Sequence, residues 1–143
     1  MLKPESILYT AEAHVSGGRE GRAETSDGRL SVSLDIPREL GGAGGPGTNP
    51  EQLFAAGYAA CFLSAVKLVG RLTKVALPAN ASIDSVVGTG RNGDRYALQT
   101  ELRVSLPGMD RAQAEDVVRG AHERCPYSNA TRGNMDVTLT VIV

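Results

Sequence analysis

The sequence predicts an α+β fold, and three of its features support that prediction. Two separate stretches show the alternation of apolar and polar side chains that is typical of strands with one buried face. A long apolar helix is expected between them, and a second helix precedes a final strand. Strands and helices that come in runs indicate the α+β class. With 143 residues, residues 1–143 are expected to form a single domain.

The first strands are expected before residue 37. Residues 7–15 form a mixed strand-like run, and the segment 17–21 interrupts it with residues typical of turns. An alternating run follows and ends at Pro37; its apolar members are Leu30, Val32, Leu34 and Ile36. Together these patterns predict a hairpin.

A helix is predicted after the glycine-rich residues 41–47 and is expected to run to about Arg71. Asn49 is a favourable N-cap, Pro50 suits the first helical position, and the Glu51 carboxylate complements the positive end of the helix dipole. The helix is apolar on nearly every side. One chain of this size cannot enclose such a helix, so we expect a second copy to cover it in a homodimer.

The same helix sets the expectation about membranes. Its uncharged apolar run extends from Leu53 to Val66, fourteen residues counted inclusively. A helix that crosses a bilayer needs roughly 20 such residues. The run therefore predicts a buried helix and no membrane contact.

The second half of the chain predicts a sheet and one more helix. A turn near residues 92–94 precedes an alternating strand over 98–106. Helical spacing follows from an N-cap at Asp110 to about Arg124, and the pair Cys125–Pro126 ends that helix. Residues 126–129 are typical of a turn-forming loop, and 137–143 alternate as a terminal strand.

Charge and composition argue against several classes of partner. The formal net charge is −1, so no strong positive field would attract nucleic acid or an anionic membrane surface. The first six residues lack the apolar core of a secretory signal, which predicts a cytoplasmic protein.

Two cysteines suggest redox chemistry more than a structural role. Cytosolic reductants keep most thiols reduced, so a disulfide here would be transient and catalytic. A structural zinc site needs about four Cys or His ligands in close pairs, and neither His14 nor His122 is spaced as a ligand pair with a cysteine. No metal site is expected.

Each candidate residue has a second interpretation that the pattern alone leaves open. A peroxidatic cysteine needs a cation or donors to favour its thiolate, and a partner to resolve its sulfenic acid. Cys61 could do this, or it could simply fill the core of an alanine-rich helix. Cys125 could lie in a mobile, accessible loop or serve as a structural cap. Arg19 could be a solvated turn residue, and Glu51 could serve only the helix dipole.

Four segments resemble one known family in the same order along the chain. The segments are GREGR at 18–22, RELGG at 38–42, TNPEQLFAAGYAACF at 48–62 and CPYSNATRGN at 125–134. They resemble the organic hydroperoxide resistance (Ohr) proteins of the Ohr/OsmC superfamily, and the likeness covers essentially the whole chain. The blocks that contain the two cysteines are the most specific part of it.

The resemblance implies a cofactor-free peroxidase that forms an intertwined homodimer, with antiparallel sheets packed around long central helices. It implies that Cys61 attacks the organic hydroperoxide and that Cys125 resolves the product as a disulfide. Arg19 and Glu51 would form an ion pair that holds the guanidinium beside the reactive sulfur. Dihydrolipoyl groups would supply the electrons. Glu20, where the family commonly has Asp, is a minor departure.

Helix geometry limits how Glu51 and Cys61 can belong to one site. Cys61 follows Glu51 by ten residues, which places them ~15 Å apart along one straight helix. Either the helix breaks between them, for instance at Gly57, or Glu51 serves the sulfur of the other subunit; we favour the second alternative.

Two alternatives for the function stay open. One is an OsmC-type peroxidase of broader substrate range that would share the cysteines. The other is a non-catalytic thiol redox sensor, which would react once where an enzyme turns over.

Overall fold

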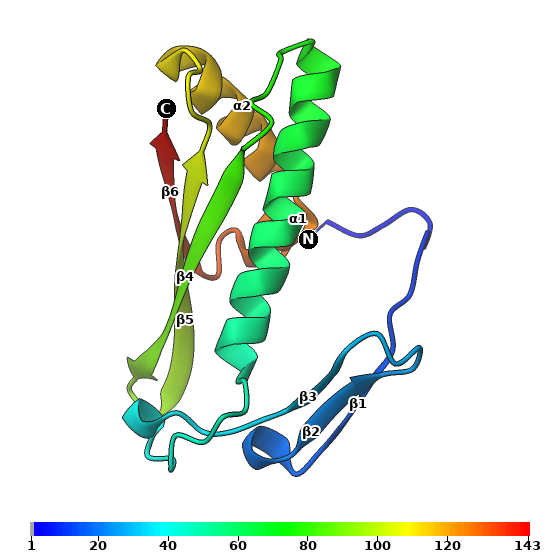
Figure 1. Cartoon of the computed structure of the whole chain (residues 1–143), viewed down its shortest axis with the longest axis vertical. Coiled ribbons are helices and arrows are strands. Elements are labelled where there is room, and N and C mark those ends of the chain that lie inside the picture. The colour runs from blue at the N-terminus through cyan, green and yellow to red at the C-terminus, as the bar shows by residue number, and fades with distance from the viewer. Residues whose placement is uncertain (1) are drawn as a thin grey trace. The chain divides into compact units, whose positions relative to one another are not determined.

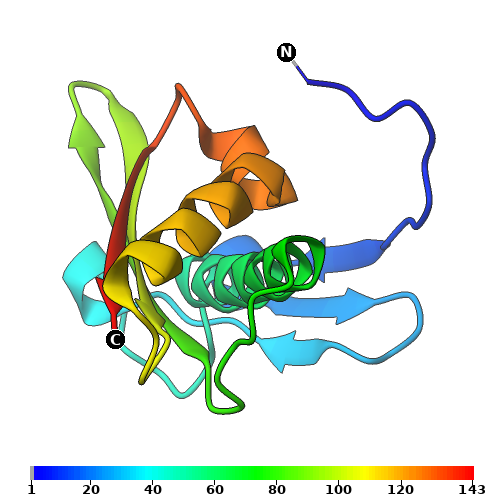
Figure 2. The same ribbon diagram turned by 90° about the horizontal axis from the view of Figure 1, so that it is seen from above.

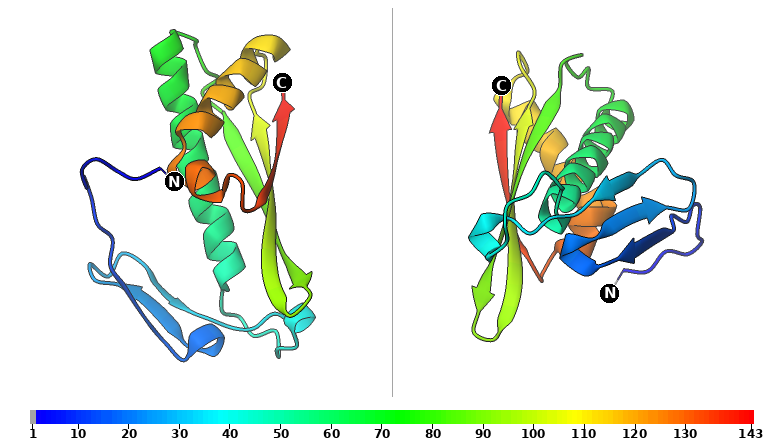
Figure 3. Two further views of the ribbon diagram at one scale, coloured as in Figure 1. Left: turned by 180° about the vertical axis from the view of Figure 1, so that it is seen from behind. Right: turned by 60° about the horizontal axis from the view of Figure 1, so that its bottom comes forward.

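Three short strands of the N-terminal part pair into an antiparallel sheet in the computed structural model, which describes residues 2–143. They are β1 (Ala13–Ser16), β2 (Arg22–Thr25) and β3 (Ser31–Ser33), in the order β1-β2-β3 (Figure 3). The chain divides into two compact units, of which the first ends at Leu53 and the second spans Phe54–Val143.

The expected strand over 7–15 is correct only at its end. Residues 7–12 form no strand, and Ile7, Leu8 and Tyr9 are largely exposed. The reason is the register of β1 on β2, which begins at the pair Ala13↔Thr25, so the earlier residues face no partner strand. Similarly, the alternating run over 30–36 contributes only β3 and a single parallel bridge between Leu34 and Thr48.

The long helix α1 (Pro50–Thr73) begins where the sequence predicts it. The side chain of Asn49 accepts a hydrogen bond from the Gln52 N–H at 2.9 Å, which confirms the N-cap. Two 3₁₀ turns, η1 (Gly18–Glu20) and η2 (Arg38–Leu40), precede the helix. After α1, Lys74 adopts a positive φ of 57° and turns the chain back toward the second sheet.

The second sheet contains β4 (Ser82–Asn92), β5 (Arg95–Ser105) and β6 (Asp136–Ile142) in that order. β4 and β5 form an antiparallel hairpin, whereas β6 runs parallel to β5 with Leu139 opposite Leu102. The expectation of wholly antiparallel sheets is therefore wrong for this pair. The chain between β5 and β6 contains two helices, which return it to the same end of the sheet (Figure 1).

These two helices are α2 (Arg111–Arg124) and α3 (Pro126–Thr131). Asp110 caps α2 through the Gln113 N–H at 3.0 Å, as the sequence predicts. Within the second unit, α1 and α2 lie on the same face of the sheet (Figures 1 and 2). The core between them is apolar and its fully enclosed members include Tyr58, Phe62, Val66, Leu102, Val104, Leu106, Ala114 and Ala121.

Helix α1 is longer than its uncharged run because it continues through Lys67 and Arg71. By length and composition it is long and apolar enough to cross a membrane, with a mean hydropathy of 1.7 over its most apolar 18-residue window, of which 33% is buried. Its buried side packs in the core of the second unit, whereas Leu68 and Leu72 are exposed. Part of an apolar helix thus lacks cover within one chain.

Candidate active site

Glycines shape the turn that carries Arg19. Gly17 has a positive φ of 70°, and a Cβ added at Gly21 would lie 1.7 Å from the carbonyl oxygen of Ser16. No side chain fits at that distance, so Gly21 is required for the turn to close. The turn η1 holds Arg19 between β1 and β2.

Backbone hydrogen bonds connect this turn to the start of α1. The Leu34 N–H donates to the Gly21 carbonyl at 2.8 Å, and the next residue, Asp35, donates its N–H to the Thr48 carbonyl at 2.9 Å. Thr48 precedes the Asn49 cap directly. These hydrogen bonds hold the residues before α1 against the residues after the Arg19 turn, so the first turn of α1 lies close to Arg19.

Arg19 and Glu51 form a bidentate ion pair as a result. The two terminal guanidinium nitrogens donate to the two carboxylate oxygens at 2.9 and 2.7 Å. The hydrogen bond from Arg19 holds the pKa of Glu51 below its usual range, and the same bond raises the pKa of Arg19. The pair is thus fully charged near neutral pH, and Glu51 fixes the direction of the guanidinium plane.

The second unit brings the two cysteines together. Cys61 lies in the middle of α1, and Cys125 lies at the junction of α2 and α3. Although 64 residues separate them in sequence, the Cys125 Sγ donates to the Cys61 Sγ at 3.5 Å. Both are free thiols. A disulfide requires about 2.05 Å between the sulfurs, so a small movement would allow the bond to form.

Cys125 is not in a mobile, accessible loop, and that expectation is wrong. Its side chain is completely buried, and its backbone both ends α2 and caps α3. Residues 126–129 were expected to form a loop, yet Pro126 occupies the first position of a helix, where its fixed φ and missing N–H are favourable. The alternative of a structural cap is therefore correct for the backbone of Cys125.

Burial is the main influence on Cys61, and it raises the pKa of the thiol. A hydrogen bond from the Tyr127 backbone N–H lowers the pKa, while the nearby Cys125 raises it. Among the residues that the structure describes, no cation contributes to these shifts. A thiolate at Cys61 therefore needs a positive charge in addition to its neighbours in the second unit.

Sequence reasoning missed the backbone amide of Tyr127. The sequence did contain a signal for it. A cysteine followed by a proline can be the N-cap and first residue of a helix. The backbone N–H of the following residue, Tyr127, then has no partner inside the helix and is free to bind another group. Reading residues 126–129 as a loop concealed this signal.

The aromatic side chains of α1 and α3 differ in exposure. Tyr58 and Phe62 are fully buried and belong to the core. Phe54 and Tyr127, whose ring centroids are 5.9 Å apart, are partly exposed. Gly57 allows this packing, because a Cβ there would lie 3.0 Å from the Tyr127 hydroxyl. Of these four aromatic residues, Phe54 and Tyr127 are thus the ones that a bound molecule could reach.

Comparison with known proteins decides the family. The model of the OsmC-like protein family matches residues 41–140, which is more than half of the chain. The chain belongs to the OsmC-like family. An organic hydroperoxide resistance protein of Xanthomonas axonopodis pv. citri is 59% identical to it over 141 residues, covering 99% of both chains. This identity places the chain among the organic hydroperoxide resistance proteins of the family, which are peroxidase-related antioxidants.

Solved structures of the family share the fold. A Legionella pneumophila organic hydroperoxide resistance protein is 48% identical with a TM-score of 0.92, and the match covers 96% of this chain and 100% of that one. A Vibrio cholerae structure of the same description, with captopril bound in one of the active sites, is 46% identical with a TM-score of 0.91 over 97% of this chain and 95% of that one. The α+β architecture is thus that of the organic hydroperoxide resistance proteins.

Helix α1 contains both Glu51 and Cys61, so its shape decides how far apart these two residues lie in one chain. The helix runs unbroken through Gly57 from Glu51 to Cys61. Of the two alternatives for joining these residues in one site, a break in the helix is therefore excluded.

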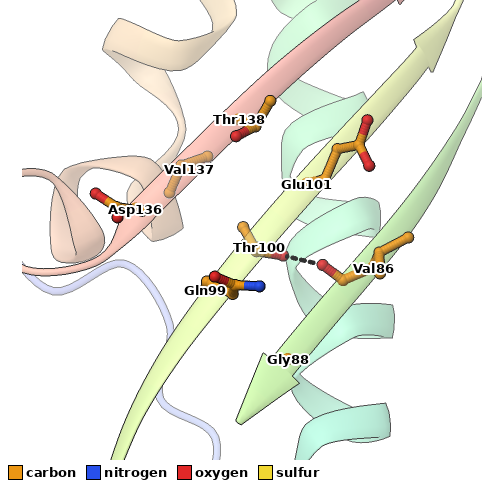
Figure 4. A pocket seen from close by; sticks show the side chains of 8 residues that line it. All are labelled: Val86, Gly88, Gln99, Thr100, Glu101, Asp136, Val137 and Thr138. Atoms are coloured by element: carbon orange, nitrogen blue, oxygen red, sulfur yellow. Dashed lines mark hydrogen bonds between the residues drawn. The ribbon is translucent and has the colours of Figure 1, made fainter. Parts of the chain in front are cut away.

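A hollow of about 660 Å³ lies on the second sheet of this OsmC-like chain, apart from both cysteines. Figure 4 shows its lining, in which Thr100 donates a hydrogen bond to the Val86 carbonyl at 3.0 Å. The other lining residues are Gly88, Gln99, Glu101, Asp136, Val137 and Thr138. It contains no thiol or cationic side chain. Residues 2–143 also include no group of three His, Cys, Asp or Glu side chains that could hold a metal ion.

Proposed function

We propose that this protein is a cytoplasmic thiol peroxidase that reduces organic hydroperoxides to alcohols. One observation carries the proposal: Cys61 and Cys125 lie 3.5 Å apart as free thiols in the core of a chain that belongs to the organic hydroperoxide resistance proteins. Burial of an unpaired thiol is common, but two thiols in contact from distant segments are suited to a reversible disulfide.

The reaction proceeds in three steps: attack on the peroxide, disulfide formation and reduction of the disulfide. The Cys61 thiolate attacks the terminal peroxide oxygen, the O–O bond breaks, and the alkoxide takes a proton to leave as the alcohol. Cys61 is then a sulfenic acid, which the thiolate of Cys125 attacks at sulfur; the S–OH bond breaks, and the hydroxide takes a proton to leave as water. A dihydrolipoyl dithiol finally reduces the Cys61–Cys125 disulfide by two thiol exchanges and becomes a cyclic disulfide itself.

Arg19 supplies the positive charge that Cys61 requires. Its guanidinium cannot lose a proton at physiological pH, so it favours the thiolate and polarises the bound peroxide. The bidentate contact with Glu51 fixes its orientation before the substrate binds. The opposing effect of burial on the pKa of Cys61 makes this charge necessary.

A homodimer assembles the complete site. The exposed apolar residues of α1, including Leu68 and Leu72, require a covering surface, and a second copy provides it in a closed two-fold pair. In that arrangement Arg19 and Glu51 of one subunit serve Cys61 of the other. The unbroken helix between Glu51 and Cys61 supports this division.

Bulky organic peroxides are the preferred substrates. Phe54 and Tyr127 offer partly exposed aromatic surface in contact with each other, and the backbone of Tyr127 contacts Cys61. Each methylene of an alkyl tail that leaves water contributes about 0.8 kcal/mol. Hydrogen peroxide has no such tail and gains nothing from this surface.

Steady-state peroxide consumption tests the proposal directly. Cumene hydroperoxide is supplied with dihydrolipoamide, thioredoxin with its reductase, or glutathione as the sole reductant. We expect sustained turnover with dihydrolipoamide and much less with the other two. A single stoichiometric reaction without turnover under all three conditions would support a redox sensor instead, and equal rates with hydrogen peroxide would favour an OsmC-type enzyme of broader range.

A further inference from the structure

Three hydroxyl groups form a buried cluster that joins α1 to α3. The Tyr58 hydroxyl lies 2.9 Å from the Ser128 Oγ and 3.3 Å from the Thr131 Oγ1. Thr131 also donates to the Tyr127 carbonyl at 2.9 Å. Tyr58 and Ser128 are fully buried, and Thr131 is 8% exposed. Apolar side chains of similar size could fill the same space with little loss of stability. The hydroxyl groups therefore suggest a role beyond stability.

The cluster attaches α3 to the core through its two buried side chains. α3 has six residues, and a helix of this length does not persist by itself in water. Its only buried residues are Ser128 and Thr131, and both are bonded to Tyr58. Tyr58 therefore helps to fix the position of α3, together with the ring of Tyr127, which packs against Phe54 and Tyr58.

Tyr58 also has a fixed relation to both sulfurs. It precedes Cys61 by three residues on α1, so the two lie on neighbouring positions of the same helix surface. Through Ser128 and Thr131 it holds the helix that Cys125 caps. The 3.5 Å contact between the sulfurs thus joins the helix that carries Tyr58 to the residue that caps the helix bonded to Tyr58.

We propose that Tyr58, Ser128 and Thr131 are positioning residues for the resolving step, which rests on the function proposed above. They hold Cys125 beside the Cys61 sulfenic acid, so that the disulfide forms before a second peroxide molecule arrives. Disulfide formation breaks the S–OH bond and releases water. In the competing reaction, a second peroxide transfers an oxygen atom to the sulfenic sulfur and leaves as the alcohol, which converts Cys61 to sulfinic acid.

The test is the partition of Cys61 between disulfide and sulfinic acid in Tyr58→Phe. This change removes one hydroxyl and keeps the ring that packs against Phe54 and Phe62. The protein is exposed to rising cumene hydroperoxide without reductant, and intact-mass spectrometry measures the sulfinic fraction. We expect this fraction to rise roughly three- to tenfold at equal peroxide, which is the effect of one lost hydrogen bond on the resolving rate. Tyr96→Phe, at an exposed tyrosine, is the matched control and should not differ from wild type.

Two further variants separate positioning from stability. Thr131→Val removes the hydroxyl and should raise the sulfinic fraction, whereas Thr131→Ser keeps it and should restore the wild-type partition, whatever their melting temperatures. An unchanged partition in Tyr58→Phe and Thr131→Val would overturn the proposal. The first step is measured separately, by sulfenic-acid trapping in a Cys125→Ser background, and should stay within about twofold in Tyr58→Phe. Absence of any sulfenic acid in the Cys125→Ser variant itself would instead refute the proposed peroxidase function.

Discussion

Arg19 and Glu51 are 32 residues apart in sequence, yet each terminal nitrogen of the guanidinium contacts its own oxygen of the carboxylate. Both atoms of the fork are occupied, so the guanidinium plane cannot rotate without breaking a hydrogen bond. An ammonium group cannot reproduce this geometry, because it has no planar fork. The consequences can be measured at Cys61.

Replacing Arg19 should therefore affect the reactive thiol. In Arg19→Ala we expect the pKa of Cys61 to rise and its reaction with cumene hydroperoxide to slow by about 10- to 100-fold, the effect of losing one charge-assisted hydrogen bond. Arg19→Lys should recover only part of the rate. Thiolate absorbance as a function of pH and stopped-flow kinetics measure the two quantities; an unchanged thiol titration in Arg19→Ala would contradict the electrostatic role.

The same ion pair should make stability depend on pH in a defined range. Glu51 has a lowered pKa in the folded protein, so its contribution is present above the unfolded value of about 4.3 and is lost as the pH falls through the folded value. We expect Glu51→Gln to melt at a lower temperature than wild type at pH 7, and we expect the difference to shrink as the pH falls below about 4.3 and through the lower folded pKa of Glu51. Arg19 is 41% exposed, so the difference should not exceed about 1 kcal/mol. A difference that persists at low pH would assign the effect to packing.

The two cysteines should fail in different ways. Cys61→Ser should abolish peroxide reduction, because no nucleophile remains. Cys125→Ser should allow one turnover and leave a sulfenic acid on Cys61, since the resolving thiol is absent. Mass spectrometry after trapping identifies the oxidised residue, and a sulfenic acid found mainly on Cys125 would reverse the two roles.

Gly21 offers a test of the turn that carries Arg19. In Gly21→Ala the new methyl group would overlap the Ser16 carbonyl, so the turn must deform at a cost of about 1–3 kcal/mol. Gly90→Ala is the control, because a Cβ there meets no atom within 4 Å. Chemical denaturation gives both free energies of unfolding. Equal stability in the two variants would show that the turn adapts without strain.

A mixing experiment tests whether the active site is shared between subunits. Glu51→Ala and Cys61→Ser proteins, each expected to be inactive, are denatured, combined and refolded together. A heterodimer with a shared site regains one complete set, made of Cys61 from the first chain and Glu51 from the second. We expect measurable peroxide reduction from the mixture alone. If verified heterodimers show none, both residues act within one chain.

Local signals in the sequence predicted the parts of the fold that depend on neighbours in the chain. Asn49 and Asp110 marked the two helix starts, and both side chains make the expected capping bonds. α3 was missed because six residues are too few to show a helical period. The parallel direction of β6 was missed because alternation identifies a strand without naming its partner.

The candidate site was less predictable from the sequence than the helix starts, because it depends on contacts between distant residues. Residue types and spacing indicated redox chemistry for Cys61 and Cys125, but only the fold brings the sulfurs to 3.5 Å. The pairing of Arg19 with Glu51 followed from family resemblance, since neither residue signals the other in sequence. The buried side chain of Cys125 contradicts the expected accessible loop. Pro126 begins a helix directly after it, and the Cys125 side chain packs in the core.

The parallel pairing of β6 with β5 also has a consequence for folding. Residues 106–135 must close as a loop before this pairing can form, and such non-local closure is slow because its entropy is lost before any contact compensates for it. α2 and α3 belong to that loop, so the place of Cys125 beside Cys61 depends on its closure. In an unfolded chain the two thiols would be separated by 64 residues. Rapid formation of this disulfide would therefore report that the chain has reached its native topology.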